Sequence, residues 1–324
     1  MRVALAALAT LIAASPVQAR ERADLLIRGA SVVDVGHGRI VPRQAVAVRG
    51  NTIVAVGPDR AISKRFGAKR TINAAGKFVM PGLWDMHVHF GGGPELIAEN
   101  KALLPLYVAY GITTVRDCAA DISASVLEWR AAVAAKGVYV TPTLNMGRIL
   151  AFLDREDHSR DEGLAYIGPG LRKTYEWRIE RAAKATPEEV AARHKEHELS
   201  MKVLPMLQAA GIPILAGTDA GYLNSFNYPG EGLHDELELY VKAGLTPQQA
   251  LASSVLTGPR FLGHADRYGA VQTGKAADLL ILNANPLKSV GATRKISAVL
   301  LHGRLLDRAA LDKLLAQAKA RASR

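Results

Sequence analysis

Both ends of the chain show short apolar runs separated by turn residues. Near the N-terminus these runs fall within 24–35, at 45–48 and at 52–56, and a further short run ends at Ile72. Gly50 and Asn51 lie between two of the runs, and both residue types suit a hairpin turn with positive φ. Near the C-terminus the runs are 278–282 and 298–301. Neither end has enough strands for a stable sheet alone, so we expect a small β-sandwich built from both ends.

Between the two ends the pattern becomes an alternation of strands and helices. Apolar runs that suit strands occur at 78–89, 112–115, 138–143 and 212–216; helical patterns occur at 95–110, 121–136 and 186–210, and from 233 and 246 onward. Thr186-Pro187-Glu188-Glu189 is a capping box, and Thr246-Pro247 is a second capped start. Residues 145–185 are polar, and we interpret them as irregular. The alternation predicts parallel strands joined by crossover helices.

The first residues have the composition of a secretory signal peptide. Arg2 provides a positive start, residues 3–14 are apolar except for one Thr, and Val17-Gln18-Ala19 has the small-residue pattern of a cleavage site. The apolar run is too short to span a bilayer as a helix. We therefore expect cleavage after Ala19 and export, to a periplasmic or secreted location, as a soluble protein.

Charge and cysteine usage exclude some classes of function. The formal net charge is +11, but there is no run of five or more Lys and Arg, and aromatic residues make up only 6% of the chain. We interpret the charge as a slightly basic, solvated surface and expect no nucleic-acid partner. Cys118 is the single cysteine, so no intramolecular disulfide can form.

The clearest chemical signal is the segment Met80-Pro81-Gly82-Leu83-Trp84-Asp85-Met86-His87-Val88-His89. Alternate residues of a strand point to the same face, so the imidazoles of His87 and His89 project together. That arrangement suits two nitrogen ligands on one divalent metal. Asp219 ends the apolar run 212–216 within Ala216-Gly217-Thr218-Asp219. A carboxylate there can bind a metal and accept a proton from water.

These motifs together resemble the amidohydrolase superfamily, in its imidazolonepropionase-like and prolidase-like group. PGLWDMHVH is similar to the family's first barrel strand, GITTVRD at 111–117 to its second, and GTDAG at 217–221 to its last. LHDELELYVKAGLTPQQAL at 233–251 and GAVQTGKAADLLILNANPL at 269–287 resemble the returning tail. The resemblance covers nearly all of the chain after the signal, in order.

The resemblance implies a metal-dependent hydrolase of carbon–nitrogen bonds. The expected α/β fold is a (β/α)₈ TIM-type barrel at 81–269, with a composite β-sandwich from 20–80 and 270–324. The resemblance implies that His87, His89 and Asp219 bind a divalent metal, with zinc as the expected ion, and that Asp219 is also the catalytic general base. The expected substrate is a small molecule such as a dipeptide, cleaved by metal-activated water.

The chain also departs from the family pattern. Members normally supply a carboxylated lysine or a glutamate and two further histidines from the middle strands, and we find no such residues here. The run 138–143 resembles the family's seventh strand, and residues 81–269 are fewer than the about 250 that a complete barrel takes. We therefore expect an incomplete barrel. The alternative function is a catalytically impaired or inactive remnant that binds metal or ligand weakly.

A few other residues are candidates for substrate binding or structure. Arg116 ends a predicted strand and could bind a substrate carboxylate; the alternative is an ion pair with a neighbouring aspartate. His234 opens a predicted helix and could face the substrate; the alternative is a structural role at the start of that helix. His194 and His197 suit a solvated helix better than a metal site. His158 is expected to be exposed and Cys118 to be a small buried residue. Open strand edges would favour a homo-oligomer.

Overall fold

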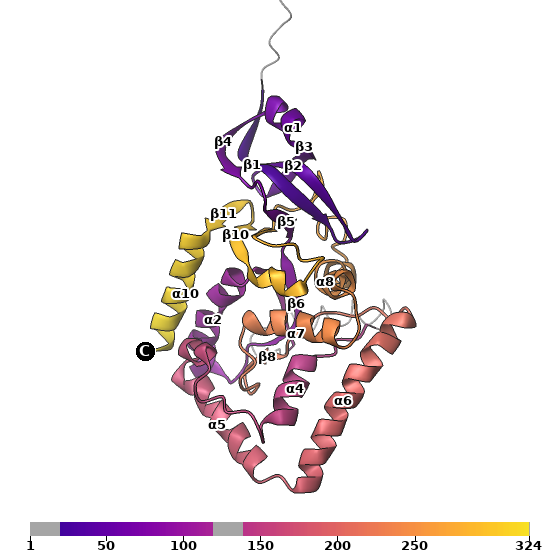
Figure 1. Cartoon of the computed structure of the whole chain (residues 1–324). Helices are drawn as coiled ribbons and strands as arrows, with labels where there is room; N and C mark the ends of the chain where they lie inside the picture. Colours follow the sequence, from indigo (N-terminus) through magenta and orange to yellow (C-terminus); the bar gives the residue numbers. More distant parts are fainter. Residues whose placement is uncertain (1–19, 119–138, 324) are drawn as a thin grey trace, which may run out of the picture.

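The computed structural model describes residues 20–118 and 139–323. The expected signal peptide and the expected helix at 121–136 lie outside these residues. Within them, no helix is both long and apolar enough to cross a membrane. In Figure 1 the strands of a large sheet lie at the top and most helices lie below them. The fold is therefore mixed α/β, as the alternating pattern predicted.

Strands from both ends of the chain form the large sheet. It contains eight strands in the order β11-β10-β9-β5-β1-β2-β3, with β4 paired to β1. Their bounds are β1 Glu21–Asp34, β2 Arg39–Arg49, β3 Thr52–Pro58, β4 Phe66–Asn73, β5 Phe78–Pro81, β9 Leu279–Leu282, β10 Ile296–Leu301 and β11 Arg304–Asp307. The short helix α1 (Asp59–Arg65) joins β3 to β4. Both ends thus meet as predicted, but hydrogen bonds join all eight strands into one sheet, and the expected sandwich is not confirmed.

The predicted hairpin and the junction between the two ends are both seen. β2 and β3 are antiparallel, and Gly50 in their turn has φ 55°. The antiparallel pairing of β5 with β9, in which Val79 faces Ile281, joins the N-terminal strands to the C-terminal ones. On its other side β5 pairs with β1. β5 is therefore the strand that links the two ends.

The predicted strand 78–89 is two strands in different sheets. β5 ends at Pro81, and β6 (Leu83–His89) begins after Gly82. A Cβ at position 82 would lie 2.2 Å from the Thr113 hydroxyl oxygen, so only glycine fits without moving that side chain. The chain passes at this point from the large sheet into a small parallel one.

The small sheet carries the predicted His-x-His segment at its centre. Its order is β7-β6-β8, with β7 Ile112–Asp117 and β8 Ala220–Gly221, and both neighbours run parallel to β6. Among the described residues of the predicted strands at 138–143 and 212–216, the strand pairing is the parallel bridge between Val140 and Ile214. Even so, the 212–216 segment lies beside β6, because Met86 donates its N–H to Ala216 O at 2.9 Å. The described residues form no closed barrel.

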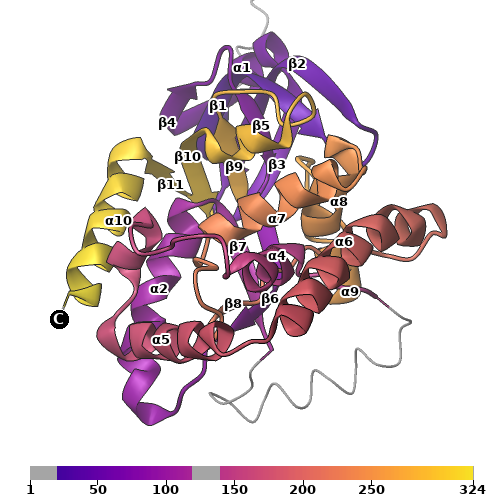
Figure 2. The same ribbon diagram turned by 60° about the horizontal axis from the view of Figure 1, so that its bottom comes forward.

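Helices surround this sheet, as Figure 2 shows from below. They are α2 Ile97–Ala109, α4 Leu144–Phe152, α5 Pro169–Ala183, α6 Pro187–Ala209, α7 Glu231–Lys242, α8 Pro247–Val255, α9 Thr257–Phe261 and α10 Arg308–Ala322, with 3₁₀ turns η1 Pro94–Leu96, η2 Glu162–Tyr166 and η3 Val290–Arg294. Complete capping boxes begin α6 at Thr186 and α8 at Thr246. The C-terminal helix α10 packs against α2.

The prediction that 145–185 is irregular was wrong. This stretch holds α4, η2 and α5. In α5 only Leu171 and Tyr175 are buried, one turn apart, and the remaining positions are mostly charged or exposed. Such a narrow apolar stripe gives little periodic signal in the sequence.

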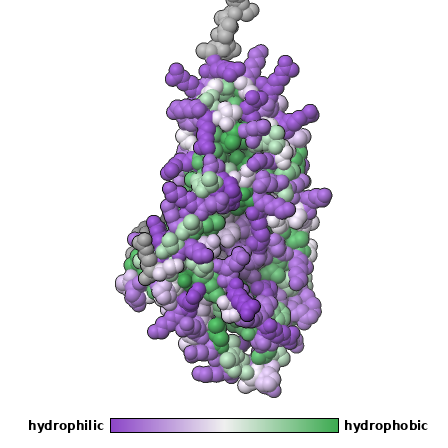
Figure 3. Space-filling model, turned by 60° about the vertical axis from the view of Figure 1, so that its left-hand side comes forward, coloured by the Kyte–Doolittle hydropathy of each residue, from purple (hydrophilic) through white to green (hydrophobic). Residues whose placement is uncertain are grey.

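One apolar core joins the small sheet to the large one. It includes Met80 of β5, Val88 of β6, Leu280 of β9 and Tyr240 of α7. The surface, in contrast, carries both apolar and polar side chains. Figure 3 shows apolar residues among polar ones on the lower part of the face that it draws. Large exposed apolar side chains occur on three helices; they are Ile97 and Leu104 of α2, Trp177 and Ile179 of α5, and Leu199, Val203 and Met206 of α6.

Candidate metal centre

The structure brings His87, His89 and Asp219 together. His89 Nε2 lies 2.6 Å from Asp219 Oδ1, His87 Nε2 lies 3.4 Å from the same oxygen, and the two Nε2 atoms are 3.2 Å apart. One ligand atom from each residue falls within 4.8 Å of the others. In the part of the chain that the structure describes, this is the one group of three or more such residues that could hold a metal ion. We call it the His-His-Asp centre.

Local backbone structure explains why these side chains meet. His87 and His89 are alternate residues of β6 and so share one face. Asp219 lies beside them because its N–H donates to His87 O at 2.6 Å. Asp219 has φ 64°, in the left-handed region that Asp tolerates better than most residues. Gly221 allows the next close approach, since a Cβ there would lie 2.0 Å from His89 O.

The electrostatics of the centre favour a bound cation. Burial by itself would lower the pKa of His87, but hydrogen bonds to Asp219 and Cys118 raise that pKa to about 10. Burial would raise the pKa of Asp219, but hydrogen bonds from His87 and His89 lower it to about 2. The carboxylate is thus ionised and favours a positive charge on the His87 imidazole. A divalent ion can replace that proton, because imidazole binds metal in its neutral form.

Asp85 supports the centre from within the core. It is fully buried on β6, and its carboxylate accepts hydrogen bonds from Thr218 N at 3.0 Å and from Thr218 Oγ1 at 2.8 Å. The N–H of His87 also donates to Asp85 Oδ1, at 3.3 Å. Burial raises the pKa of Asp85 to about 6, although these hydrogen bonds act in the opposite direction. Asp85 therefore fixes both segments that carry the metal-ligand candidates.

A second buried network holds the loop after Asp219. Asn227 donates from its side chain to Thr218 O, and Asn145 Nδ2 donates to Asn227 Oδ1 at 3.0 Å. Glu236 of α7 accepts from the backbone N–H groups of Leu144 at 2.8 Å and Asn145 at 2.6 Å. Burial raises the pKa of Glu236 to about 8, against the effect of those two hydrogen bonds. The network thus connects α7, the start of α4 and the centre.

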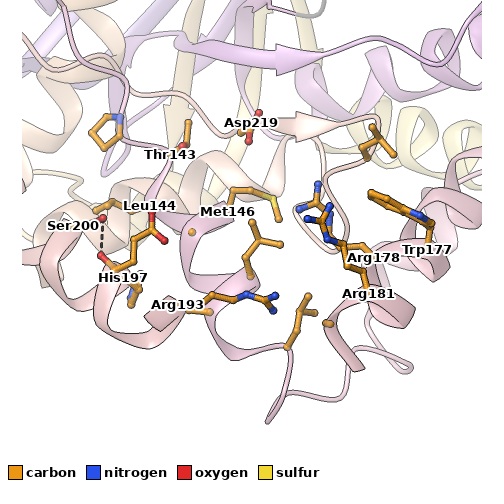
Figure 4. A pocket seen from close by; sticks show the side chains of 18 residues that line it. Thr143, Leu144, Met146, Trp177, Arg178, Arg181, Arg193, His197, Ser200 and Asp219 are labelled. Carbon is orange, nitrogen blue, oxygen red and sulfur yellow. Dashed lines mark hydrogen bonds between the residues drawn. The ribbon is translucent and has the colours of Figure 1, made fainter. Parts of the chain in front are cut away.

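A pocket of about 650 Å³ opens onto the centre. Of the centre, Asp219 lines this pocket, together with the nearby Leu223, and most of the other lining residues belong to α4, α5 and α6. Figure 4 shows Arg178 and Arg181 entering from α5 and Arg193 from α6, with Asp219 at the top of the view. Volumes of this order are typical of small-molecule sites.

The two predicted substrate-binding residues lie elsewhere. Arg116 donates from Nη1 to Met86 O at 3.1 Å, and its guanidinium lies 5.4 Å from the centre of the Phe261 ring. His234 is fully buried, with Nδ1 2.9 Å from Thr293 Oγ1 and Nε2 2.9 Å from Tyr110 O. Burial lowers the pKa of His234 to about 3. Neither residue lines the pocket beside Asp219.

Three further histidines, at positions 158, 194 and 197, have structural surroundings. His194 stacks on Phe152 at 4.9 Å and pairs with Asp154 at 3.0 Å, and His197 contacts the same ring edge-on at 5.6 Å. The expectation that His158 is exposed was wrong. Its side chain is 11% exposed because it stacks on Phe226 at 4.4 Å, with Nδ1 2.9 Å from Asp161.

Sequence reasoning missed several residues around the centre. Asp85 carried a usable signal, because it precedes His87 by two positions on the same strand and so shares its face. Cys118 follows β7 and interacts with His87, which its reading as a small buried residue did not anticipate. Arg178 lies in the stretch interpreted as irregular. Asn227 and Glu236 are far from Asn145 in the sequence and contact it only in the folded structure, so no local pattern marks them.

Comparisons with known proteins agree with the geometry. Two curated relatives match short segments. One is adenine deaminase 3 of Rhizobium meliloti (strain 1021), which is 36% identical over 97 residues, or 30% of this chain and 16% of that protein. The other is the imidazolonepropionase of Chloroflexus aggregans (strain MD-66 / DSM 9485), which is 45% identical over 74 residues, or 23% of this chain and 17% of that protein. The matched segments span less than a fifth of either relative.

Solved structures show the same fold at low sequence identity. A Xaa-Pro dipeptidase with methionine bound in its active site has a TM-score of 0.59 at 16% identity, covering 87% of this chain and 99% of that one. An adenosine deaminase from Xanthomonas campestris with bound Zn has a TM-score of 0.57 at 19% identity, covering 94% of this chain and 100% of that one.

The family assignment comes from a sequence match over more than half of the chain. Residues 123–306 match the Amidohydrolase family. That segment includes Asp219 and its loop, and the fold and the His-His-Asp centre fit the same family. The chain therefore belongs to the amidohydrolase family.

Proposed function

We propose that this protein is an exported, metal-dependent hydrolase that cleaves an amide or peptide-like C–N bond of a small substrate. The observation that carries the proposal is the convergence of His87, His89 and Asp219, because Asp219 also lines a pocket of about 650 Å³. Membership of the amidohydrolase family supports the same reaction class.

The donor set fits a divalent metal. His87 Nε2, His89 Nε2 and a carboxylate oxygen of Asp219 would hold the ion, and two imidazoles with one carboxylate are a set that catalytic zinc sites use. We propose zinc, and a solved structure of similar fold has bound Zn. When bound, such an ion supplies Lewis acidity that activates water and polarises a carbonyl group.

The chain's own residues would position the reactants and move the proton. Asp219 is ionised, so its carboxylate can accept a proton from the attacking water. Asp85 and Thr218 hold Asp219 and His87 in register through buried hydrogen bonds. The pocket walls from α4, α5 and α6 would orient the substrate and limit the access of bulk water.

A second candidate function is that of an impaired member of the family that binds metal or ligand weakly. The observation that favours it is the small number of ligands, since the described residues offer one group of three and no closed barrel. Tight metal binding together with turnover would favour the hydrolase, and weak binding without turnover the impaired member.

Export is part of the proposal and has its own test. The positive charge of Arg2, the apolar run at 3–14 and the cleavage pattern at Val17-Gln18-Ala19 support export. Mass spectrometry of the exported protein should give a chain that begins at Arg20. A protein found only inside the cell, and beginning at Met1, would contradict export.

The central experiment measures metal content and hydrolysis on the same preparation. The purified protein lacking residues 1–19 would be analysed for metals and assayed with dipeptides and N-acyl amino acids. His87→Ala should abolish both metal retention and hydrolysis. His37→Ala is the matched control, because that side chain is 75% exposed and belongs to a different part of the fold. Hydrolysis that survives His87→Ala would refute the proposed centre.

A further inference from the structure

We propose that the pocket selects substrates with a carboxylate group, and that Arg178 binds this carboxylate while the C–N bond lies at the His-His-Asp centre. This inference rests on the proposed function and defines its substrate class. Three independent features of the pocket support it: the state of Arg178, its connection to Asp219, and the charge of the surrounding wall.

Arg178 is a half-buried guanidinium with unused hydrogen-bonding capacity. Its Nη2 donates to Asn224 Oδ1 at 3.3 Å. Its Nε is buried and has no hydrogen-bond partner, and none of the ion pairs formed by described residues involves Arg178. A buried donor without a partner is costly, so such a group points to a ligand. Burial and the neighbouring Arg181 lower the pKa of the guanidinium, and the charge of Asp219 acts in the opposite direction.

Arg178 is connected to the metal-ligand candidates through one residue. Asn224 accepts from Arg178 and donates from its own amide to Asp219 O. Both Arg178 and Asp219 line the same pocket. A small molecule that contacts the guanidinium can therefore also reach the centre, with Asn224 fixing the spacing between them.

The wall around Arg178 carries further positive charge. Arg181 and Arg193 also line the pocket, and the described ion pairs include neither of them. Besides Asp219, the acidic lining residue is Glu196. Three guanidinium groups against two carboxylates favour an anionic ligand. A planar guanidinium fork binds a carboxylate through two parallel hydrogen bonds, which adds orientation to attraction.

Apolar lining residues define the rest of the ligand. Met146, Leu150 and Leu223 border the pocket beside the charged groups. The class that fits is an N-acyl amino acid or a dipeptide, with its carboxylate at Arg178 and an apolar side chain against α4. Hydrolysis breaks its acyl C–N bond, and water gives a hydroxyl group to the acyl carbon and a proton to the amine nitrogen.

The first test measures binding and does not require turnover. N-acetyl-L-leucine and its neutral carboxamide, N-acetyl-L-leucinamide, would be titrated by calorimetry into the protein lacking residues 1–19, at fixed salt. We expect the carboxylate to bind at least tenfold more tightly than the carboxamide. Arg178→Gln should remove this difference by weakening the carboxylate alone, and Arg178→Lys should restore only part of it.

The controls separate this inference from the proposed function. Lys173→Gln removes an exposed positive charge from the same helix and should preserve the tenfold difference. If carboxylate selectivity depends on Arg178 but no hydrolysis occurs, the ligand class stands and the hydrolase proposal fails. In an active protein, Arg178→Gln should raise KM for carboxylate substrates at least tenfold with a smaller change in kcat.

Two results would overturn the inference. One is equal affinity for the carboxylate and the carboxamide in the unmodified protein, which needs no variant and so does not depend on whether Arg178→Gln folds. The other is displacement of N-acetyl-L-leucine by inorganic phosphate at comparable affinity, because that would indicate a general anion site.

Discussion

Asp85 and Thr218 form two hydrogen bonds across a separation of 133 residues, one to the Thr218 N–H and one to its hydroxyl group. Both residues are fully buried. This pair fastens β6, with His87 and His89, to the segment that ends in Asp219. A specific buried contact therefore brings the two distant segments that carry the metal-ligand candidates together.

The first prediction concerns this pair. Asp85→Ala would leave the Thr218 N–H buried without an acceptor and its hydroxyl group with only the longer contact to His87 O at 3.4 Å. Each buried donor that loses its acceptor costs about 1–3 kcal/mol. The free energy of unfolding in urea should fall by about 3 kcal/mol. Asp85→Asn keeps the shape of the side chain and one acceptor oxygen, so the free energy of unfolding should fall less. Asp266→Ala changes an exposed residue and should stay within about 0.5 kcal/mol; an equal loss there would remove any special role for Asp85.

The second prediction concerns metal binding and stability. A ligand that binds only the folded state stabilises it by about 2.7 kcal/mol at a hundredfold excess over Kd. Thermal melts should therefore show a higher Tm when zinc is added to the chelator-treated protein. His89→Ala should lose this increase and His37→Ala should keep it. The same increase in His89→Ala would place the bound zinc away from the His-His-Asp centre.

The third prediction concerns the pH dependence that Glu236 causes. Burial raises the pKa of this residue from its ordinary value of 4.5 to about 8. The folded state therefore favours the protonated carboxyl group, and the associated stability is complete below about pH 4.5 and declines as pH rises toward 8. Urea unfolding of the protein and of Glu236→Gln should be compared from pH 5 to pH 8.

The quantity to compare is the free energy of unfolding of the unmodified protein minus that of Glu236→Gln. This difference should fall as pH rises, by up to about 1.4 kcal/mol for each pH unit. The Gln variant is the appropriate reference because its amide does not titrate in this range. A difference that stays constant, or that grows with pH, would show that the hydrogen bonds from Leu144 and Asn145 outweigh the burial of the charge.

The fourth prediction concerns self-association. Leu199, Val203 and Met206 are spaced along one face of α6 and are 50%, 42% and 67% exposed. Together with the small parallel sheet, which the described residues do not close into a barrel, they favour pairing with a second copy. Light scattering should give twice the mass of one chain, and Val203→Glu should reduce it, whereas Lys64→Glu, at an exposed position of α1, should not. A stable monomer with a sharp thermal transition would mean that the helices already seal the fold.

The sequence allowed much of the fold and the core of the candidate site to be predicted. The His87 and His89 pair followed from strand alternation, and Asp219 from its place after an apolar run. Both capped helices were predicted at the correct residues, because a capping box is a local signal. The joining of the two chain ends followed from counting strands.

The parts that could not be predicted depend on contacts between distant segments. Glu236 binds the start of α4 from 91 residues away, and nothing near it in sequence marks that contact. The predicted strand 138–143 gives way to α4 at Leu144, after Thr143 adopts φ 48°. Arg178 gave no signal because α5 buries only two side chains, so the helix that carries it was not recognised.

The pairing of β5 with β9 also bears on how the protein folds. The two strands come from opposite ends of the described chain, and without β9 that side of β5 has no partner and the shared core lacks Leu280. Closing so long a loop is slow, because its entropy is lost before the contact is gained. Since Val88 of β6 packs in the same core, we expect the core beneath the His-His-Asp centre to be completed only when this contact forms.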